Sequence, residues 1–276
     1  MNAFVDQPFT GFLDAEAAAL GKRFLGDGYV IVPVEDKPEL DRLRNAMAGI
    51  AAAHLGQPKP EDAGAFMNGI HRHVTAAALN DLRLQTINGT NALSWVRKAY
   101  YSLARGALDM LVGNELVMQR RLNLSIQLPN DDSSLLAVHA DSWDGDSPFE
   151  VVAWLPLVDC YRTKAMYLLP PDKGAKVEAE FGRFQGRAEQ DLYDAVEADL
   201  KWLTVPFGSI LLFNQNLMHG NVVNREAETR WSMNCRFKSL FSPYAGKRLG
   251  EFFEPITIRA ATRLAMQYRF PEGLHE

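Results

Sequence analysis

The stretch LLAVHAD, residues 135–141, ends an apolar run with an imidazole and a carboxylate, His139 and Asp141. We expect this run to be extended. Side chains on a strand repeat every two residues, so these two groups point the same way. His219, 78 residues after Asp141, also follows a predicted strand and turn. Because two imidazoles and one carboxylate can occupy one face of a metal ion, the three residues are candidate metal ligands and catalytic residues.

The alternative is that the two histidines are unrelated, because a His-Xaa-Asp triplet arises by chance in many proteins. Two neighbouring features favour the metal. Gly220 directly follows His219 and permits close approach of a ligand. Eleven residues after His219, Arg230 lies on an alternating strand. Imidazole and carboxylate ligands suit Fe(II), Mn or Zn rather than Cu(I).

Residues 229–240 predict a long strand with one polar face, made of Arg230, Ser232, Asn234 and Arg236. A buried arginine needs an anion, and its guanidinium fork matches a carboxylate with two hydrogen bonds. Arg230 and Arg236 are about 20 Å apart along an extended strand, too far to hold the same small anion. Arg230 is expected to bind that anion. Arg236 is then either a structural ion-pair partner or a contact to an anionic substrate or subunit.

Residues 121–128 alternate strictly between aliphatic and polar side chains. The polar face consists of Asn123, Ser125 and Gln127. Two explanations remain open. Either this face is exposed to solvent, or it lines the cavity of a closed sheet.

Helical patterns dominate the first third of the chain, and short strands separated by turn residues follow. The predicted helices are 11–25, 38–54, 91–112, 189–200 and 257–268, and the predicted strands are 29–34, 121–128, 149–158, 166–169, 203–205, 209–213 and 229–240. This order predicts a mainly β protein with flanking helices, a double-stranded β-helix of the cupin-like jelly-roll type. We expect one domain over residues 1–276, with a helical part at 1–115, a jelly-roll core at about 120–245 and an insertion at about 173–200.

The composition argues against several classes of protein. The formal net charge of −5 and the isoelectric point of about 5.7 do not favour binding to nucleic acid or to a membrane surface. No apolar stretch approaches the roughly 20 residues of a membrane span, and residues 1–16 lack the pattern of a secretory signal. Cys160 and Cys235 lie in apolar segments and are expected to be buried free thiols in a reducing compartment. These features predict a cytoplasmic protein.

A second histidine pair, His71 and His73, is the other place where a metal could bind. No cysteine or carboxylate flanks the pair in a ligand pattern, and Arg72 lies between the two histidines. The sequence therefore favours a loop or substrate-facing role for this pair over a metal site.

Several blocks of sequence resemble the phytanoyl-CoA dioxygenase-like family of Fe(II)/2-oxoglutarate oxygenases. They are GDGYVIVPV (26–34), HAD (139–141), AMYLLPPDKG (165–174), WLTVPFGSILLFNQNLMHGN (202–221) and TRWSMNCRF (229–237). The segment RWSMNCRFKSLFSPY (230–244) is similar to a branch found with carbohydrate-biosynthesis clusters, including enzymes linked to aminosugar antibiotics. The blocks are scattered over residues 20–245.

The resemblance implies a role for each matched residue. His139, Asp141 and His219 match the iron ligands, and Arg230 matches the arginine that binds the distal carboxylate of 2-oxoglutarate. Gln127 lies on a strand that often contacts the cosubstrate or substrate in such enzymes. The expected substrate-side residues are Trp143, Asn123, Asn234 and Arg236. The implied cofactors are Fe(II), 2-oxoglutarate as cosubstrate, and O2.

Two departures from the family pattern affect the segment after residue 170. Pro171-Asp172-Lys173 stands where the family usually has Gly-Ser-His, so the role of that loop is open. The insertion at 173–200 has no counterpart in the family pattern, and a lid or a subunit contact are both compatible with it.

The resemblance implies oxidation of a small-molecule substrate, with 2-oxoglutarate converted to succinate and carbon dioxide. Hydroxylation, desaturation, ring formation and epimerisation all stay open. The polar faces and the branch favour a sugar, nucleotide-sugar or aminosugar-type intermediate as the substrate. An amino acid or a peptide natural product stays open as an alternative substrate. The sequence does not indicate the oligomeric state. Two other classes remain: a cupin-type metal-dependent hydrolase or isomerase, and a non-catalytic ligand-binding jelly roll.

Overall fold

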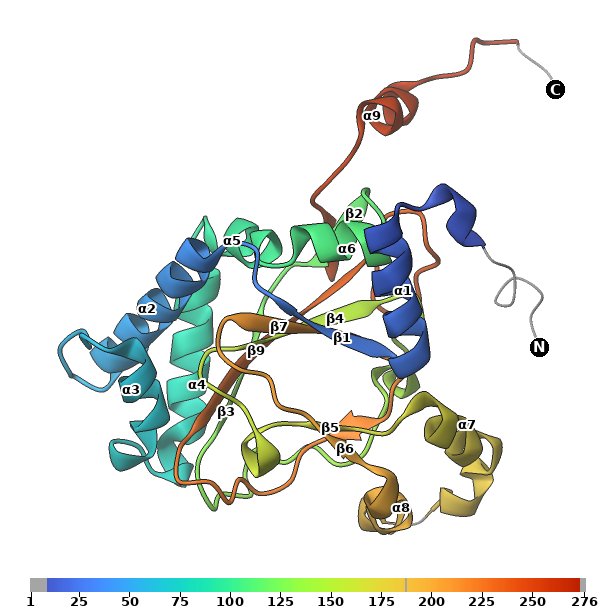
Figure 1. The fold of residues 1–276 in the computed structure, drawn as a ribbon. Coiled ribbons are helices and arrows are strands. Elements are labelled where there is room, and N and C mark those ends of the chain that lie inside the picture. The colour runs from blue at the N-terminus through green and yellow to red at the C-terminus, as the bar shows by residue number, and fades with distance from the viewer. Residues whose placement is uncertain (1–8, 187, 274–276) are drawn as a thin grey trace.

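A computed structural model of the protein describes residues 9–186 and 188–273. Two antiparallel β-sheets face each other, and helices cover the outside of both (Figure 1). The protein is thus mainly antiparallel β with flanking helices and has a jelly-roll fold, which confirms the fold class predicted from the sequence.

The larger sheet has seven strands in the order β1-β7-β4-β9-β2-β10, and β3 pairs with β9. Its strands are β1 (Tyr29–Pro33), β2 (Leu116–Gln119), β3 (Asn123–Gln127), β4 (Val151–Pro156), β7 (Ser209–Asn214), β9 (Arg230–Ser239) and β10 (Phe253–Pro255). The central strand β4 is buried along its whole length between β7 and β9, as expected for its apolar sequence.

The smaller sheet has the order β6-β5-β8, with strands β5 (Tyr167–Leu168), β6 (Lys201–Trp202) and β8 (His219–Gly220). The predicted strand 203–205 is wrong in its bounds, because Val205 makes only an isolated bridge to Cys160. Pro206 follows directly and has no backbone N–H to continue a ladder.

The helices of the first third pack on the larger sheet (Figure 1). They are α1 (Ala15–Asp27), α2 (Lys37–His54), α3 (Ala63–Asn68), α4 (Ala76–Asn91), α5 (Val96–Ser102) and α6 (Arg105–Leu111). Helix α1 has its predicted N-terminal cap, since Asp14 accepts a hydrogen bond from the backbone N–H of Ala17 at 2.8 Å. It ends at Gly28 in the left-handed conformation, with φ of 75°.

The predicted single helix 91–112 is wrong, because the chain forms α5 and α6 with a break at Ala104. Ala104 leaves the helical conformation, with φ of −144°. The carboxylate of Glu35 then accepts hydrogen bonds from the backbone N–H groups of Gly106 at 2.8 Å and Ala107 at 3.3 Å. A side chain distant in sequence therefore satisfies the backbone N–H groups in the first turn of α6, and local sequence cannot show such a contact.

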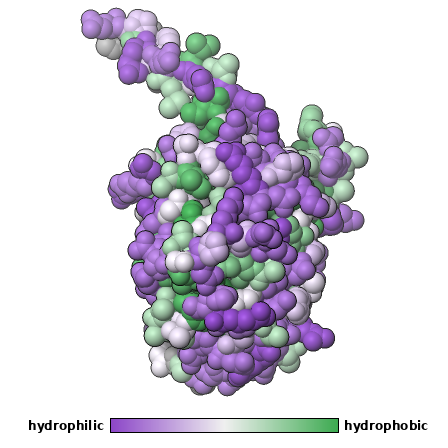
Figure 2. Space-filling model, turned by 90° about the vertical axis from the view of Figure 1, so that its left-hand side faces the viewer, coloured by the Kyte–Doolittle hydropathy of each residue, from purple (hydrophilic) through white to green (hydrophobic). Residues whose placement is uncertain are grey.

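The insertion folds as α7 (Pro171–Ala179) and α8 (Glu189–Val196), which lie beyond the smaller sheet (Figure 1). The helix predicted for 189–200 ends earlier and continues as a 3-10 turn over Glu197–Asp199. Helix α9 (Ala260–Gln267) was predicted and carries no buried residue. Its segment stands clear of a largely hydrophilic body in Figure 2.

Both cysteines, Cys160 and Cys235, are buried free thiols, as predicted. Among residues 9–186 and 188–273, no helix combines the length and the apolar character needed to cross a membrane.

Candidate metal centre

His139 and His219 lie side by side on the edge of the smaller sheet. Their backbones exchange both hydrogen bonds of an antiparallel bridge, at 3.0 Å from the N–H of His139 and 2.8 Å from the N–H of His219. Asp141 follows at the start of a 3-10 turn over Asp141–Asp144, and its N–H donates to the carbonyl of Gln215 at 3.1 Å. The two segments that carry the three side chains are thus held together by their backbones.

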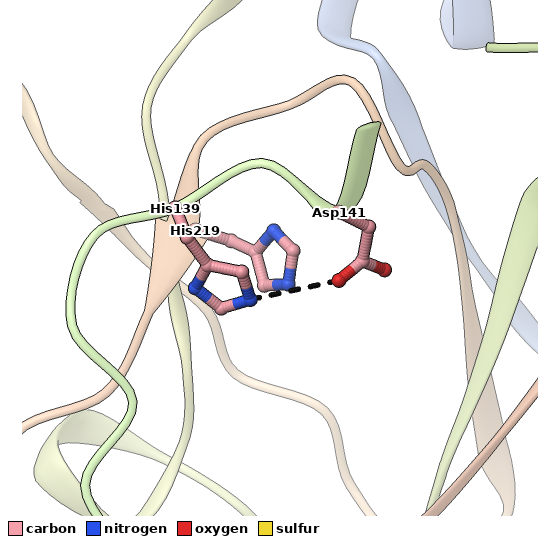
Figure 3. Close-up of side chains that lie close together, drawn as sticks. All are labelled: His139, Asp141 and His219. Carbon is pink, nitrogen blue, oxygen red and sulfur yellow. Dashed lines mark ion pairs between the residues drawn. The ribbon is translucent and has the colours of Figure 1, made fainter. Parts of the chain in front are cut away.

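The three side chains converge (Figure 3). One ligand atom from each of His139, Asp141 and His219 lies within 4.8 Å of the other two. The Nε2 atom of His139 is 3.5 Å from Oδ1 of Asp141, and the two imidazole centroids are 4.4 Å apart. Within the described part of the chain, no other group of His, Cys, Asp or Glu donors converges in this way.

Each imidazole is oriented by a backbone carbonyl two residues before it. The Nδ1 atom of His139 is 2.8 Å from the oxygen of Ala137, and Nδ1 of His219 is 2.9 Å from the oxygen of Leu217. A carbonyl only accepts, so each neutral ring carries its proton on Nδ1 and has a free lone pair on Nε2. Metal-ligating histidines commonly show this outer hydrogen bond, because it fixes the ring and its tautomer.

The pKa of His219 is lowered to about 4, mainly by burial and to a smaller extent by the charge of His139. Burial alone would raise the pKa of Asp141, but the His139 ring and the charges of His219 and Arg236 hold it well below its usual range. Burial alone would lower the pKa of His139, but the Asp141 carboxylate and the Ala137 carbonyl raise it above its ordinary value. At neutral pH His219 is therefore neutral and Asp141 ionised, the protonation states that metal ligands need.

A cavity of about 230 Å³ opens beside the three residues. Its polar lining includes Asn123, Ser125, Asn221 and Asn234, and the amide of Asn123 donates to that of Asn234 at 2.8 Å. Its apolar lining comprises Leu136, Val152, Trp154, Met166 and Phe213. The sequence left open whether the polar face of residues 121–128 is exposed to solvent or lines a cavity. Asn123 and Ser125 of this face line the cavity.

Arg230 also lines this cavity and is only 3% exposed. Its guanidinium donates to the carbonyl of Ala165 at 3.3 Å and to the hydroxyl of Ser125 at 3.0 Å, while its Nε has no partner. No carboxylate of the described residues lies within ion-pair distance of it. Burial lowers the pKa of Arg230 to about 10, so at neutral pH it remains a buried cation that lacks an anion.

Arg236, expected either as an ion-pair partner or as a substrate contact, lies against Asp141. Its Nη2 is 2.8 Å from Oδ2 of Asp141, and its Nε is 3.4 Å from Oδ2 of Asp146 and 3.9 Å from Oε2 of Glu150. Arg236 is therefore an ion-pair partner of carboxylates of its own chain, although its side chain also borders the cavity.

Two residues expected at the site do not line the cavity. Trp143 is 39% exposed and contacts Phe181 of the insertion, with ring centroids 4.7 Å apart. Gln127 is buried opposite Arg230 in the β3–β9 pair, and its amide nitrogen donates to the carbonyl of Val222 at 2.6 Å. Its amide oxygen has no partner.

Sequence reasoning left open whether Ser125 lines a cavity, and it missed Asn221 as a site residue. Both could have been found by the two-residue repeat, because Ser125 lies between Asn123 and Gln127 on β3 and Asn221 is two residues after His219. His71 does not line the cavity and does not converge with the three candidate ligands, and its Nδ1 is 3.0 Å from the hydroxyl of Thr229.

The residues present fit a divalent metal with open positions. The donors are two imidazole nitrogens with free lone pairs and one ionised carboxylate oxygen, on the wall of a cavity. Two histidines and one carboxylate with open positions are typical of non-haem Fe(II) sites.

No protein-family model matches the chain, and no curated protein matches its sequence. Solved structures match its fold. The non-haem monooxygenase ThoJ in complex with nickel aligns with a TM-score of 0.56 at 17% identity, over 92% of this chain and 89% of its own. EctD from S. alaskensis with 2-oxoglutarate and 5-hydroxyectoine aligns with a TM-score of 0.53 at 18% identity, over 88% and 83%. HygX from Streptomyces hygroscopicus with nickel and 2-oxoglutarate aligns with a TM-score of 0.50 at 14% identity, over 86% and 90%.

The alignments span most of each chain, so the similarity concerns the whole architecture rather than one motif. The chain has the jelly-roll fold of non-haem, 2-oxoglutarate-dependent oxygenases.

Proposed function

We propose that the protein is an Fe(II)- and 2-oxoglutarate-dependent oxygenase that oxidises a polar small molecule. One observation carries the proposal: the triad of His139, Asp141 and His219 shares its cavity with the buried, unpaired cation Arg230. A metal site alone would fit many enzymes. A metal site with a buried arginine that lacks an anion fits a cosubstrate with a free carboxylate.

In this proposal His139, Asp141 and His219 hold the iron, and Arg230 with Ser125 holds the distal carboxylate of 2-oxoglutarate. When bound, the iron would supply the chemistry that activates O2. The oxidant is O2, of which one oxygen atom would go to 2-oxoglutarate as it becomes succinate and carbon dioxide and the other would be available to oxidise the substrate. Ser125 already accepts a hydrogen bond from Arg230, so its own proton is free for a carboxylate oxygen. Apolar walls at Trp154 and Phe213 limit the access of water to the centre.

The uncharged polar groups that line the cavity suggest the chemistry of the substrate. Asn123, Asn221 and Asn234 present amides, while Asp141 engages Arg236 and Arg230 is assigned to the cosubstrate. No uncommitted cation then remains among the described cavity residues for a phosphate or a substrate carboxylate. We therefore propose that an uncharged, hydroxyl-bearing part of a sugar or aminosugar-type substrate enters the cavity, and that any phosphate of a nucleotide-sugar stays outside it.

The organisation of the chain is part of the same proposal. One hydrophobic core includes Leu43 of α2, Tyr100 of α5, Leu211 of β7 and Trp231 of β9, which supports a single domain. The buried free thiols support a reducing, cytoplasmic location.

The test measures succinate formation by protein reconstituted with Fe(II) under anaerobic conditions and then exposed to oxygen. We expect succinate only when Fe(II), 2-oxoglutarate and O2 are all present, with none above background for His219→Ala. A panel of sugars and aminosugars should then include compounds that raise the rate. Metal-dependent turnover without 2-oxoglutarate would instead indicate a cupin-type hydrolase or isomerase. Absence of both metal and 2-oxoglutarate binding would contradict an enzyme of this kind.

A further inference from the structure

Arg236 connects the central strand β9 to the segment that follows Asp141. Its guanidinium lies 2.8 Å from Oδ2 of Asp141, and its other side faces Asp146 and Glu150. The side chains of Asp146 and Glu150 are 1% and 0% exposed. A buried cation thus lies among three carboxylates from one short stretch of chain.

The surroundings fix Arg236 in place. Lys247 forms a second ion pair with Asp146, and the backbone N–H of Ser147 donates to Glu150 at 3.2 Å. Arg236 lies in a strand paired on both sides, because β4 pairs along it and Gln119 of the neighbouring β2 accepts its backbone N–H at 3.2 Å. The strand thus gives the guanidinium a rigid base. Asp146 and Glu150 attract it through charge at 3.4 Å and 3.9 Å, although its Nε makes no hydrogen bond.

The two oxygens of Asp141 face different groups. Oδ1 lies on the side of His139, 3.5 Å from its Nε2, and Oδ2 lies on the side of Arg236. A carboxylate free to rotate could offer either oxygen, or both, to a cation. The ion pair with Arg236 removes that freedom and leaves Oδ1 for the centre.

We propose that Arg236 is a positioning residue that holds Oδ2 of Asp141, so that Asp141 offers the metal a single oxygen in a fixed direction. The inference rests on the proposed metal centre. It assigns Arg236 to the centre rather than to the substrate, because its guanidinium is already occupied by carboxylates of its own chain.

When Arg236 is replaced, the positioning role and simple electrostatics predict opposite changes in the affinity for metal. Removing a positive charge beside the centre should by itself strengthen the binding of a cation. Removing the group that orients a ligand should weaken binding, typically 10–100-fold when an outer partner of a metal ligand is lost. The direction of the change therefore separates the two roles.

The experiment titrates the metal-free protein with Mn(II) and follows free Mn(II) by its electron paramagnetic resonance signal, with no turnover required. We expect Arg236→Gln to bind at least about tenfold more weakly than the wild type, and Arg236→Lys to weaken binding less. Arg97→Gln is the matched control. Arg97 also forms an ion pair, with Glu254 of β10, but this pair is partly exposed to solvent and does not line the cavity. The affinity of this variant for Mn(II) should therefore stay within about twofold of that of the wild type.

The possible failures are distinguishable. If the wild type binds no Mn(II), or Asp141→Ala binds it as tightly as the wild type, the proposed metal centre is wrong. If Asp141→Ala loses binding while Arg236→Gln binds as tightly as the wild type or tighter, the centre stands and the positioning role is overturned.

A second variant covers the case in which Arg236→Gln does not fold, as judged by near-ultraviolet circular dichroism. Asp146→Asn keeps Arg236 but removes the charge of one of its two other anchors. A looser guanidinium should weaken Mn(II) binding by less than the roughly 10–100-fold expected when the partner of Asp141 is itself removed. Unchanged affinity in this variant would overturn the inference.

Discussion

His139 and His219, which are 80 residues apart in the chain, exchange both of their backbone hydrogen bonds and bring their ring centroids to 4.4 Å. The bridge joins the segment before Asp141 to β8, and β8 pairs with β5. A metal held by both rings would therefore also hold this edge of the smaller sheet together.

Metal binding should raise the thermal stability of the protein. At a free metal concentration of about 100 times Kd, binding contributes about 2.7 kcal/mol, which corresponds to roughly 5–10 °C in Tm for a protein of this size. Differential scanning calorimetry with and without Mn(II) measures the shift. His219→Ala should show no shift, and an equal shift in that variant would place the stabilising metal elsewhere.

The histidine pair at residues 71 and 73 should not contribute to the metal. His71 is engaged with Thr229, 3.0 Å from its hydroxyl. The double variant His71→Ala/His73→Ala is expected to keep the metal stoichiometry of the wild type, measured by elemental analysis after dialysis. Loss of metal from a variant that remains folded would show that the pair supplies ligands.

Arg230 and Arg236 should separate in their effects on 2-oxoglutarate. Arg230→Ala removes the proposed contact to the distal carboxylate, a hydrogen bond to a charged group worth about 1.5–3 kcal/mol, so affinity should fall roughly 10- to 150-fold. Arg236→Ala should leave the affinity for 2-oxoglutarate nearly unchanged once metal is saturating. Calorimetric titration measures both, and the opposite pattern would exchange the two assignments.

Gly220→Ala should disturb the centre through the backbone. A Cβ atom at this position would collide with the hydroxyl of Tyr167 and lie 2.7 Å from the carbonyl oxygen of Leu136. The overlap should cost about 1–3 kcal/mol of stability and displace the adjacent His219, weakening Mn(II) binding. Denaturant unfolding and metal titration are the measurements. Adding Tyr167→Phe should recover part of the stability, because the hydroxyl it removes has no hydrogen-bond partner; if nothing is recovered, the collision with Tyr167 is not the cause.

Glu150 should make the metal-free protein less stable as the pH rises. Burial, followed by the charge of Asp146, raises the pKa of Glu150 from its ordinary value of 4.5 to about 7. Between these values the folded state binds more protons than the unfolded state, so this group destabilises the fold progressively as pH increases. The free energy of unfolding of Glu150→Gln, relative to that of the wild type, should increase by on the order of 2–3 kcal/mol as the pH is raised from 4.5 to above 7. Urea unfolding at several pH values with a chelator present measures the difference, and a difference independent of pH would mean that Glu150 keeps its ordinary pKa.

The sequence predicted the helices and strands that local chemistry defines and missed those that depend on distant contacts. The Asp14 cap and the left-handed Gly28 define α1, and both signals are local. Helix α4 was not predicted because its buried positions include Thr86 and Thr90, which blur the apolar pattern of a helix face.

The candidate site divides in the same way. The two-residue repeat predicted that His139 and Asp141 share a side, and it holds at the start of a 3-10 turn because Ala140 remains extended, with φ of −115° and ψ of 134°. The partner of Arg236 could not be predicted. Asp146 and Glu150 reach it only because the loop after Asp141 folds back against β9. The periodicity of the sequence does not predict the path of this loop.

The carbonyl groups that orient the two imidazoles have a consequence for how freely this centre can change during evolution. The groups that fix the rings are the backbone oxygens of Ala137 and Leu217, which any amino acid at those positions would supply. Selection for the centre therefore restricts the ligands themselves far more than their neighbours. A lineage can replace most of the surrounding residues and still present the same two nitrogens, so in proteins built this way ancestry should persist longer in backbone geometry than in recognisable sequence.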